Sequence, residues 1–228
     1  GREAAFLSLS RAETDGKYLN LELDAAIRKY HLEDRERTLF TILVYGVAER
    51  KIQLDYILAQ YSRTPFAKLD NDVRILLRLG AYQILFLDRV PDSAACNESV
   101  ELSKKYVNRG ATSFINAMLR QIVRQKDHIS YPDPVRSPIS YLSAYYSFPE
   151  WMCEMWMNTF GFARTASLLH AFNRPAPMTL HINTLRTTRD AYLARLAEAG
   201  IAATASTRTK NAVLLKQSMP VAALPGME

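Results

Sequence analysis

Basic side chains gather between residues 103 and 126, a stretch with no Asp or Glu. If residues 112–126 form a helix, Asn116, Arg120 and Arg124 recur at four-residue intervals on one exposed face. The other cations come from the preceding segment, from the connection through Gly110 and from the end of the stretch: Lys104, Lys105, Arg109 and Lys126. Such a surface suits a phosphate backbone. Ordinary solubilising charges, and cations placed favourably near helix C-termini, explain the pattern equally well.

A second polar group lies near the C-terminal end of the chain. His181 and Asn183 lie in a short alternating segment that reads as a strand, and Arg186 and Arg189 follow it. A small α/β module of this kind can present a sheet or its edge to RNA. A packing module with charged flanks is the equally acceptable alternative.

Other chemistry finds little support. Every glycine is isolated, so no glycine-rich loop exists to bind phosphates or a nucleotide-like cofactor. The four histidines lie in different segments without metal-ligand spacing. Cys96 and Cys153 read as packing thiols, and the acidic residues sit among Arg and Lys at surface-helix spacings. The sequence therefore predicts no catalytic residue, no cofactor and no metal in this chain.

Composition sets wider limits. The 228 residues are 48% hydrophobic, enough for one large or two small cores, and the net charge of +6 is weak evidence for nucleic acid by itself. No uncharged apolar run is long enough for a membrane span, and the charged N-terminus does not resemble a signal peptide. We expect a cytoplasmic protein without membrane contact.

Apolar spacing of three or four residues predicts helices over residues 5–12, 19–30, 39–61 and 73–87. The last of these is apolar almost all round, as in a helix enclosed by others. Gly80 lies in its middle, where glycine costs about 1 kcal/mol relative to alanine. Close approach of a neighbouring helix would compensate for that cost.

The pattern changes after a proline-rich segment at residues 131–138. Ser147 and Glu150 have capping-box spacing before a helix that Gly161 would close, and a second helix follows to about residue 172. Further elements are expected as strands over 178–183 and 212–215 and a helix over 187–199. The predicted fold has two domains: an all-α bundle at 1–128, a linker at 129–142 and a small α+β domain at 143–228.

Two long segments carry a family resemblance. Residues 73–106, VRILLRLGAYQILFLDRVPDSAACNESVELSKKY, and 110–124, GATSFINAMLRQIVR, resemble the NusB-like antitermination-factor domain. The version they resemble is the one at the N-terminus of bacterial ribosomal RNA cytosine-C5 methyltransferases of the RsmB/Sun type. Residues 38–58 look like the preceding part of that domain. Residues 145–156, 173–201 and 220–227 look like the small α/β domain (RRM-like or ferredoxin-like) that follows it.

The resemblance implies that the full-length protein is an S-adenosylmethionine-dependent methyltransferase acting on small-subunit ribosomal RNA. In that family the cofactor and two cysteines, in Pro-Cys and Thr-Cys-Pro sequences, belong to a later domain. Neither Cys96 nor Cys153 adjoins a proline, so no catalytic residue carries over. We expect the natural protein to continue beyond Glu228 into a methyltransferase domain, and the present chain to be inactive alone. His181 stands where the family commonly has arginine, whereas Asn183 matches.

Two other functions stay open on the sequence. The chain could be a stand-alone NusB-like module that binds RNA or protein in transcription antitermination, although the α/β half disfavours this. It could also be an interaction scaffold without RNA affinity.

Overall fold

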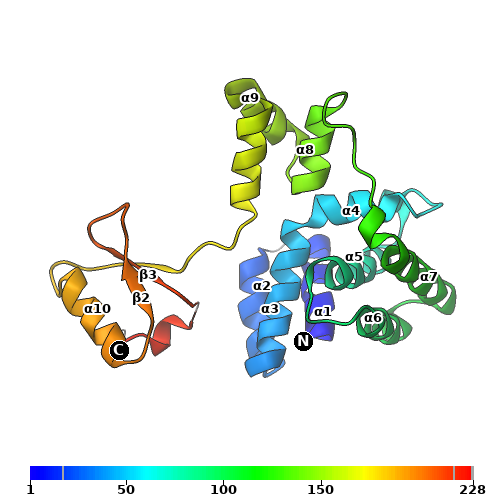
Figure 1. Ribbon diagram of the computed structural model, residues 1–228. Coiled ribbons are helices and arrows are strands. Elements are labelled where there is room, and N and C mark those ends of the chain that lie inside the picture. Colours follow the sequence, from blue (N-terminus) through cyan, green and yellow to red (C-terminus); the bar gives the residue numbers. More distant parts are fainter. Residues whose placement is uncertain (17, 218, 227–228) are drawn as a thin grey trace. The chain divides into compact units, whose positions relative to one another are not determined.

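The computed structural model describes residues 1–16, 18–217 and 219–226 (Figure 1). The last two residues of the predicted α+β domain, Met227 and Glu228, lie outside these described residues. Two compact units are present, Gly1–His170 and Ala171–Glu228. The first unit is helical and the second contains a small sheet, so the predicted fold class is confirmed.

The first unit begins with a bundle of seven α-helices among its described residues. Their bounds are α1 Arg2–Asp15, α2 Leu19–Lys29, α3 Asp34–Glu49, α4 Lys51–Ala59, α5 Asn71–Phe86, α6 Asp92–Tyr106 and α7 Arg109–Gln125. Short 3₁₀ helices, η1 Phe66–Lys68 and η2 Lys126–His128, precede α5 and follow α7. Two more helices complete the unit, α8 Pro138–Tyr146 and α9 Glu150–Phe172, of which α9 runs past the unit boundary.

Helix α5 is the centre of this bundle and contacts α1, α3, α4, α6 and α7. Asp70 caps its start, because the side chain accepts a hydrogen bond from the Asp72 amide. A Cβ atom placed on Gly80 would lie 2.6 Å from Leu119 Cδ1 and 3.0 Å from Ser99 Oγ. The predicted close approach at Gly80 is therefore confirmed, and the approaching helices are α6 and α7.

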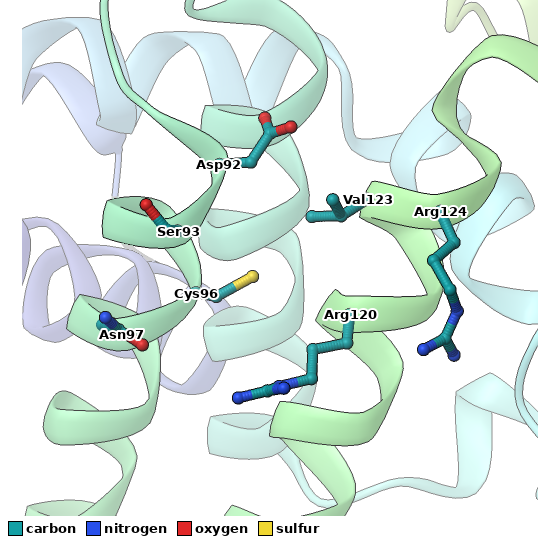
Figure 2. Close-up of a pocket in the computed structure, with 7 residues that line it drawn as sticks. All are labelled: Asp92, Ser93, Cys96, Asn97, Arg120, Val123 and Arg124. Carbon is teal, nitrogen blue, oxygen red and sulfur yellow. The ribbon is translucent and has the colours of Figure 1, made fainter.

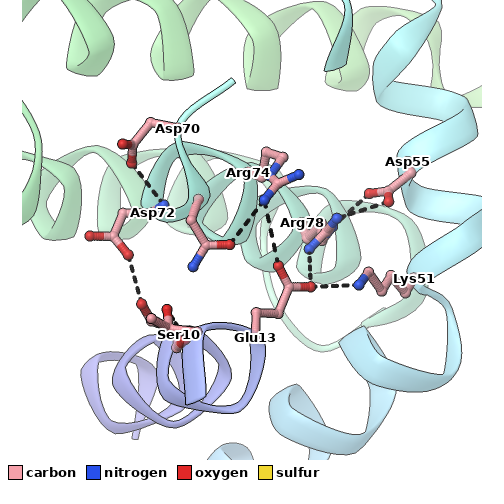
Figure 3. A network of polar contacts seen from close by, with 10 residues as sticks. Ser10, Glu13, Lys51, Asp55, Asp70, Asp72, Arg74 and Arg78 are labelled. Carbon is pink, nitrogen blue, oxygen red and sulfur yellow. Dashed lines mark hydrogen bonds and ion pairs between the residues drawn. The ribbon is translucent and has the colours of Figure 1, made fainter. Parts of the chain in front are cut away.

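A partly buried ionic network ties α5 to α1 and α4 (Figure 3). Arg78 is only 3% exposed, and its Nε and Nη2 donate to Asp55 Oδ1 and Oδ2 at 2.6 and 2.8 Å. Its Nη1 donates to Glu13 Oε1 at 2.6 Å, and Lys51 Nζ lies 2.7 Å from the same oxygen. Each charge in the network has an opposite partner, as burial requires.

The structure contains two helices, α3 and α4, where the sequence predicted one. The segment predicted as 39–61 breaks at Arg50, which adopts φ −96° and ψ 11° between α3 and α4. The apolar spacing continues through this point, and neither Gly nor Pro marks it. Tertiary packing of the two helices on α5 overrides the local pattern.

The region from 138 to 172 differs from its prediction in detail. Residues 138–142 of the predicted linker belong to α8. The predicted capping box is wrong, because Ser147 ends α8 at φ 64° instead of beginning α9. Its Oγ accepts a hydrogen bond from the backbone N–H of Gln53 at 3.3 Å. Glu150 is the first residue of α9 and accepts from Ser140 Oγ at 2.8 Å. Gly161, at φ 74°, interrupts α9 as expected, and helix continues to Phe172.

The second unit contains a three-stranded antiparallel sheet in the order β1-β3-β2. Its elements are β1 Thr179–His181, α10 Arg189–Glu198, β2 Ala203–Ala205, β3 Ala212–Leu215 and the 3₁₀ helix η3 Val221–Ala223. Helix α10 contacts β2 and β3 over a core that includes Leu196 and Val213. Strand β2 was not predicted, since its Ala-Thr-Ala sequence lacks the apolar β-branched residues that indicate strands.

Candidate nucleic-acid interface

Helices α6 and α7 form a hairpin that carries most of the predicted basic residues. The turn between them ends at Asn108, whose Oδ1 accepts from the Ala111 amide at 2.9 Å and so caps α7. Helix α7 therefore starts at Arg109, three residues before the predicted 112. Its buried stripe comprises Ile115, Met118, Leu119 and Ile122. Arg120 and Arg124 are exposed and Asn116 is partly exposed, so the predicted outer face of α7 is confirmed as a structural feature.

Two hollows follow the line where α6 and α7 meet. The first, of about 470 Å³, is lined by Asp92, Ser93, Cys96, Asn97, Arg120, Val123 and Arg124 (Figure 2). The second, of about 450 Å³, is lined by Val100, Lys104, Val107, Arg109, Thr112, Ser113 and Asn116. We call the two hollows together the α6–α7 groove. Of its α6 side, Lys104 was predicted, but Ser93 and Asn97 were missed, although their four-residue spacing was visible in the sequence.

The predicted lysines are each paired with a carboxylate. Lys104 Nζ lies 2.5 Å from Glu101 Oε1, and Lys105 Nζ lies 3.2 Å from Glu3 Oε2. Lys126 Nζ lies 2.7 Å from Asp92 Oδ2, and this hydrogen bond raises the pKa of Lys126. Hydrogen bonds from Tyr106 and Lys105 lower the pKa of Glu3. The positive charge of each of these lysines is thus partly neutralised by its carboxylate partner.

Two predicted arginines of α7 have neutral partners instead. Arg120 Nε donates to Asn116 Oδ1 at 3.0 Å, and Arg124 Nη2 donates to Gln121 Oε1. In the described part of the chain, no carboxylate lies within ion-pairing distance of Arg109, Arg120 or Arg124. Three guanidinium groups on this hairpin therefore form no ion pair in the described structure, although the Asp92 carboxylate lines the same hollow as Arg120 and Arg124.

Both cysteines are structural. Cys96 is 7% exposed at the wall of the first hollow, and burial raises its pKa, with Arg120 opposing and Asp92 adding to that effect. Cys153 is fully buried, and burial raises its pKa to about 11. Neither thiol is set up as a thiolate nucleophile.

The second predicted group lies in the turn before α10 and at the first residue of α10, Arg189. Asn183 Oδ1 accepts from the Leu185 amide at 3.1 Å, so this side chain shapes the turn. Arg189 Nη1 donates to the Ser206 carbonyl at 3.5 Å, and its Nε lies 3.7 Å from Asp190 Oδ1. Arg186 is exposed. The structure places the three residues together, but two of them already serve internal contacts.

The described residues form neither a metal-binding cluster nor a membrane-spanning helix. No group of three or more His, Cys, Asp or Glu side chains is arranged to hold a metal ion. No helix in residues 1–16, 18–217 and 219–226 has the length and apolar character needed to cross a membrane.

Comparison with known proteins gives a consistent assignment. Residues 1–124 match the NusB family, and residues 148–222 match the family described as "Methyltr_RsmF/B-like, ferredoxin-like domain". The first match covers more than half of the length of this chain, so the chain belongs to the NusB family. The second match shows that a ferredoxin-like domain of RsmF/B-like methyltransferases follows.

Named relatives are similar over most of the chain. A "Probable ribosomal RNA small subunit methyltransferase B" of Bacillus subtilis is 34% identical over 200 residues, covering 88% of this chain and 44% of the relative. The "Ribosomal RNA small subunit methyltransferase B" of Pseudomonas putida is 33% identical over 225 residues, covering 99% and 50%. The crystal structure of PH0851 shares the fold with a TM-score of 0.64 at 17% identity, covering 96% of this chain and 49% of that one. The chain spans about half the length of the curated relatives it matches.

Proposed function

We propose that this chain is the RNA-recognition portion of an S-adenosylmethionine-dependent ribosomal RNA (cytosine-C5)-methyltransferase that acts on small-subunit RNA in the cytoplasm. The names of the relatives, which are similar to this chain at up to 99% coverage, support the substrate class. The observation that carries RNA binding is the α6–α7 groove, where three arginines lack any described carboxylate partner.

The chemistry of such an enzyme belongs to residues outside this chain. S-adenosylmethionine would supply the methyl group, and a cysteine thiolate would activate the cytosine by attack on C6. Cys96 and Cys153 are buried thiols with raised pKa values, and the chain has no glycine-rich loop for the cofactor. The residues present do not fit a cofactor site, so the contribution of this chain is binding and orientation of RNA.

The proposed RNA-binding residues fall into two groups. The hairpin and the η2 helix after it contribute Lys104, Lys105, Arg109, Asn116, Arg120, Arg124 and Lys126. The turn before α10 and the first residue of α10 contribute Asn183, Arg186 and Arg189. Phosphate contacts by such groups position a protein on RNA without reading sequence. Arg109, Arg120 and Arg124 should carry most of the affinity, because the lysines share their charge with Glu3, Asp92 and Glu101.

A salt titration of RNA binding tests this proposal. We expect the present chain to bind a fluorescent fragment of small-subunit ribosomal RNA in an anisotropy assay. Arg120→Glu combined with Arg124→Glu should weaken binding at least about tenfold and reduce the slope of log K against log salt by roughly two or more.

The matched control is Arg28→Glu combined with Arg164→Glu, which changes net charge equally at exposed sites on α2 and α9. This control should weaken binding by no more than about threefold. Equal losses in the two double variants would show that only net charge matters. Absence of RNA affinity in the unmodified chain at low salt would remove the proposal.

A further inference from the structure

Helices α8 and α9 form a hairpin on which large apolar side chains are concentrated at the surface. Among the described residues, 13 large apolar side chains are exposed, and six of them lie between residues 145 and 172. Trp151 is 64% exposed and Met155 is 48% exposed. They are four residues apart on α9 and therefore lie side by side on its surface. Exposed apolar patches of this kind mark interaction surfaces.

Aromatic rings add to the exposed apolar surface of the hairpin. The rings of Tyr141 and Tyr145 on α8 stack at a centroid distance of 5.3 Å. Phe162 of α9 lies 6.2 Å from Tyr141, again between ring centroids. Tyr145 and Phe162 are both exposed. We call Tyr145, Trp151, Met155 and Phe162 the exposed apolar set of the hairpin.

The hairpin does not need this set for its own core. That core consists of Leu142, Cys153 and Leu169, all fully buried. Trp156 is partly buried and packs against Phe148, with ring centroids 5.9 Å apart. Trp151 has no such ring contact in the described part of the chain. The exposed apolar set is therefore available to a partner.

The charge of the hairpin argues against RNA as that partner. Residues 137–163, which include α8 and the first part of α9, contain no Lys, Arg or His, and their acidic residues are Glu150 and Glu154. Nucleic-acid binding depends on cations that neutralise phosphates, and this segment has none. Trp, Tyr, Phe and Met are instead the residues enriched in the cores of protein interfaces.

The relatives indicate which protein surface is available to cover the hairpin. The Bacillus subtilis relative matches this chain over 44% of its own length, and the Pseudomonas putida relative over 50%. In each relative a body about as large as the present chain therefore accompanies the matched region. The proposed function assigns methyl transfer to that body.

We propose that the exposed apolar set of the α8–α9 hairpin docks against the methyltransferase half of the same protein. The docked surface is apolar opposite Trp151 and Met155. It carries Lys or Arg near Glu154, which is exposed beside them and forms no ion pair among the described residues. This inference rests on the proposed function and specifies where its two halves meet.

Oxidation by hydroxyl radicals, measured residue by residue with mass spectrometry, tests the inference on the natural full-length protein and on the present chain. Docking should lower the oxidation rates of Trp151, Met155 and Tyr145 at least about fivefold in the full-length protein, because interface cores exclude water. Tyr18, which is 78% exposed near the start of α2, is the internal control and should react at the same rate in both.

Two outcomes of this comparison overturn different statements. Equal oxidation rates of Trp151 and Met155 in the two proteins, with RNA methylation by the full-length protein, would overturn the inference and leave the proposed function standing. A natural protein without a methyltransferase half would overturn both.

A double variant of the full-length protein tests whether these side chains hold the two halves together. Trp151→Ala combined with Met155→Ala should raise the oxidation rate of Tyr145 to its rate in the present chain, because the docked surface separates from the hairpin. The matched control is Val135→Ala combined with Leu185→Ala, which truncates exposed apolar side chains outside the hairpin and should leave Tyr145 protected. Protection of Tyr145 in both double variants would contradict docking through Trp151 and Met155.

Other occupants of the surface give different results. If RNA covers the hairpin, a fragment of small-subunit ribosomal RNA added to the present chain should slow the oxidation of Trp151. If a second copy covers it, a higher concentration of the present chain should do the same. Either result would overturn the inference, whereas a Trp151 rate independent of RNA and of concentration supports it.

Discussion

Arginine occurs in two contrasting settings in the helical unit. Arg78 on α5 is 3% exposed and is held by the carboxylates of Asp55 and Glu13. Arg120 on α7 is exposed and is held by the neutral amide of Asn116. The same side chain is a cross-link between helices in the first setting and an uncompensated surface charge in the second.

The difference lies in what a polyanion would gain from each charge. The charge of a guanidinium that is buried with two carboxylates is neutralised by them, so the guanidinium holds helices together and does not attract a polyanion. An exposed guanidinium with an amide partner is oriented but not neutralised, so it can release counterions from a nucleic acid. Partner chemistry therefore separates structural cations from candidate binding cations better than exposure alone. The paired lysines of α6 and η2 lie between these extremes.

The largest effect is expected at Arg78. Arg78→Met should lower the free energy of unfolding by about 3–5 kcal/mol, because Asp55 and Glu13 lose the charge that compensates their burial. Urea denaturation followed by far-ultraviolet circular dichroism measures this loss. Arg120→Met is the matched control and should change stability by no more than about 0.5 kcal/mol. Equal stability of the two variants would break the comparison.

Gly80 lies on α5, the helix that carries Arg78. It packs against Leu119 of α7, the helix that carries Arg120. Gly80→Val should cost about 2 kcal/mol, because the overpacking exceeds the small gain in helix propensity. The displaced α7 should also bind RNA more weakly. In a Leu119→Ala background the additional cost should fall, and a double-mutant cycle in urea measures this coupling. Strict additivity would show that the contact does not position α7.

A smaller effect is expected from the ionisation of Glu13. Burial by itself would raise the pKa of Glu13, but Lys51 and Arg78 outweigh it and hold this pKa below its ordinary value of 4.5. The stabilisation is therefore complete above that value and is lost as pH falls through the lower folded-state pKa. The stability difference between the unmodified chain and Glu13→Gln should shrink as urea midpoints are measured from pH 7 to pH 3. A difference independent of pH would contradict the assignment.

The smallest effects should separate lysine from arginine on the hairpin. Arg124→Ala should weaken RNA binding by roughly three- to tenfold, whereas Lys105→Ala should change it by less than about twofold. Glu3→Gln, which removes the carboxylate that pairs with Lys105, should strengthen binding slightly. Anisotropy under identical salt conditions measures all three. If Lys105→Ala weakened RNA binding as much as Arg124→Ala, ion pairing with carboxylates would not reduce the contribution of the lysines to RNA affinity.

The spacing of apolar and polar residues was sufficient to predict those parts of the fold in which tertiary packing agrees with it. The all-round apolar character of α5, the close approach at Gly80 and the exposed face of α7 were each predictable from spacing. The break at Arg50 was not, because the apolar pattern runs through it. Strand β2 was missed because Ala-Thr-Ala forms a strand only through its pairing with β3.

The candidate site was predictable only in part, for a similar reason. Residue types and spacing identified the cations, but not which of them meet an acid. Glu101 lies three residues from Lys104 and could have been recognised as its partner. Glu3 and Asp92 reach Lys105 and Lys126 from distant positions in the chain, and only the folded bundle brings them together. Whether these residues bind RNA stays a prediction.

Both tryptophans of the chain, Trp151 and Trp156, lie in α9. That helix and α8 share a small core of their own around Leu142, Cys153 and Leu169, apart from the main core of α1 to α7. Intrinsic tryptophan emission will consequently report on α9 and the small core that it shares with α8, whereas circular dichroism reports on all the helices. Emission and circular dichroism curves that fail to coincide during denaturation would show that α8 and α9 melt as a separate cooperative unit.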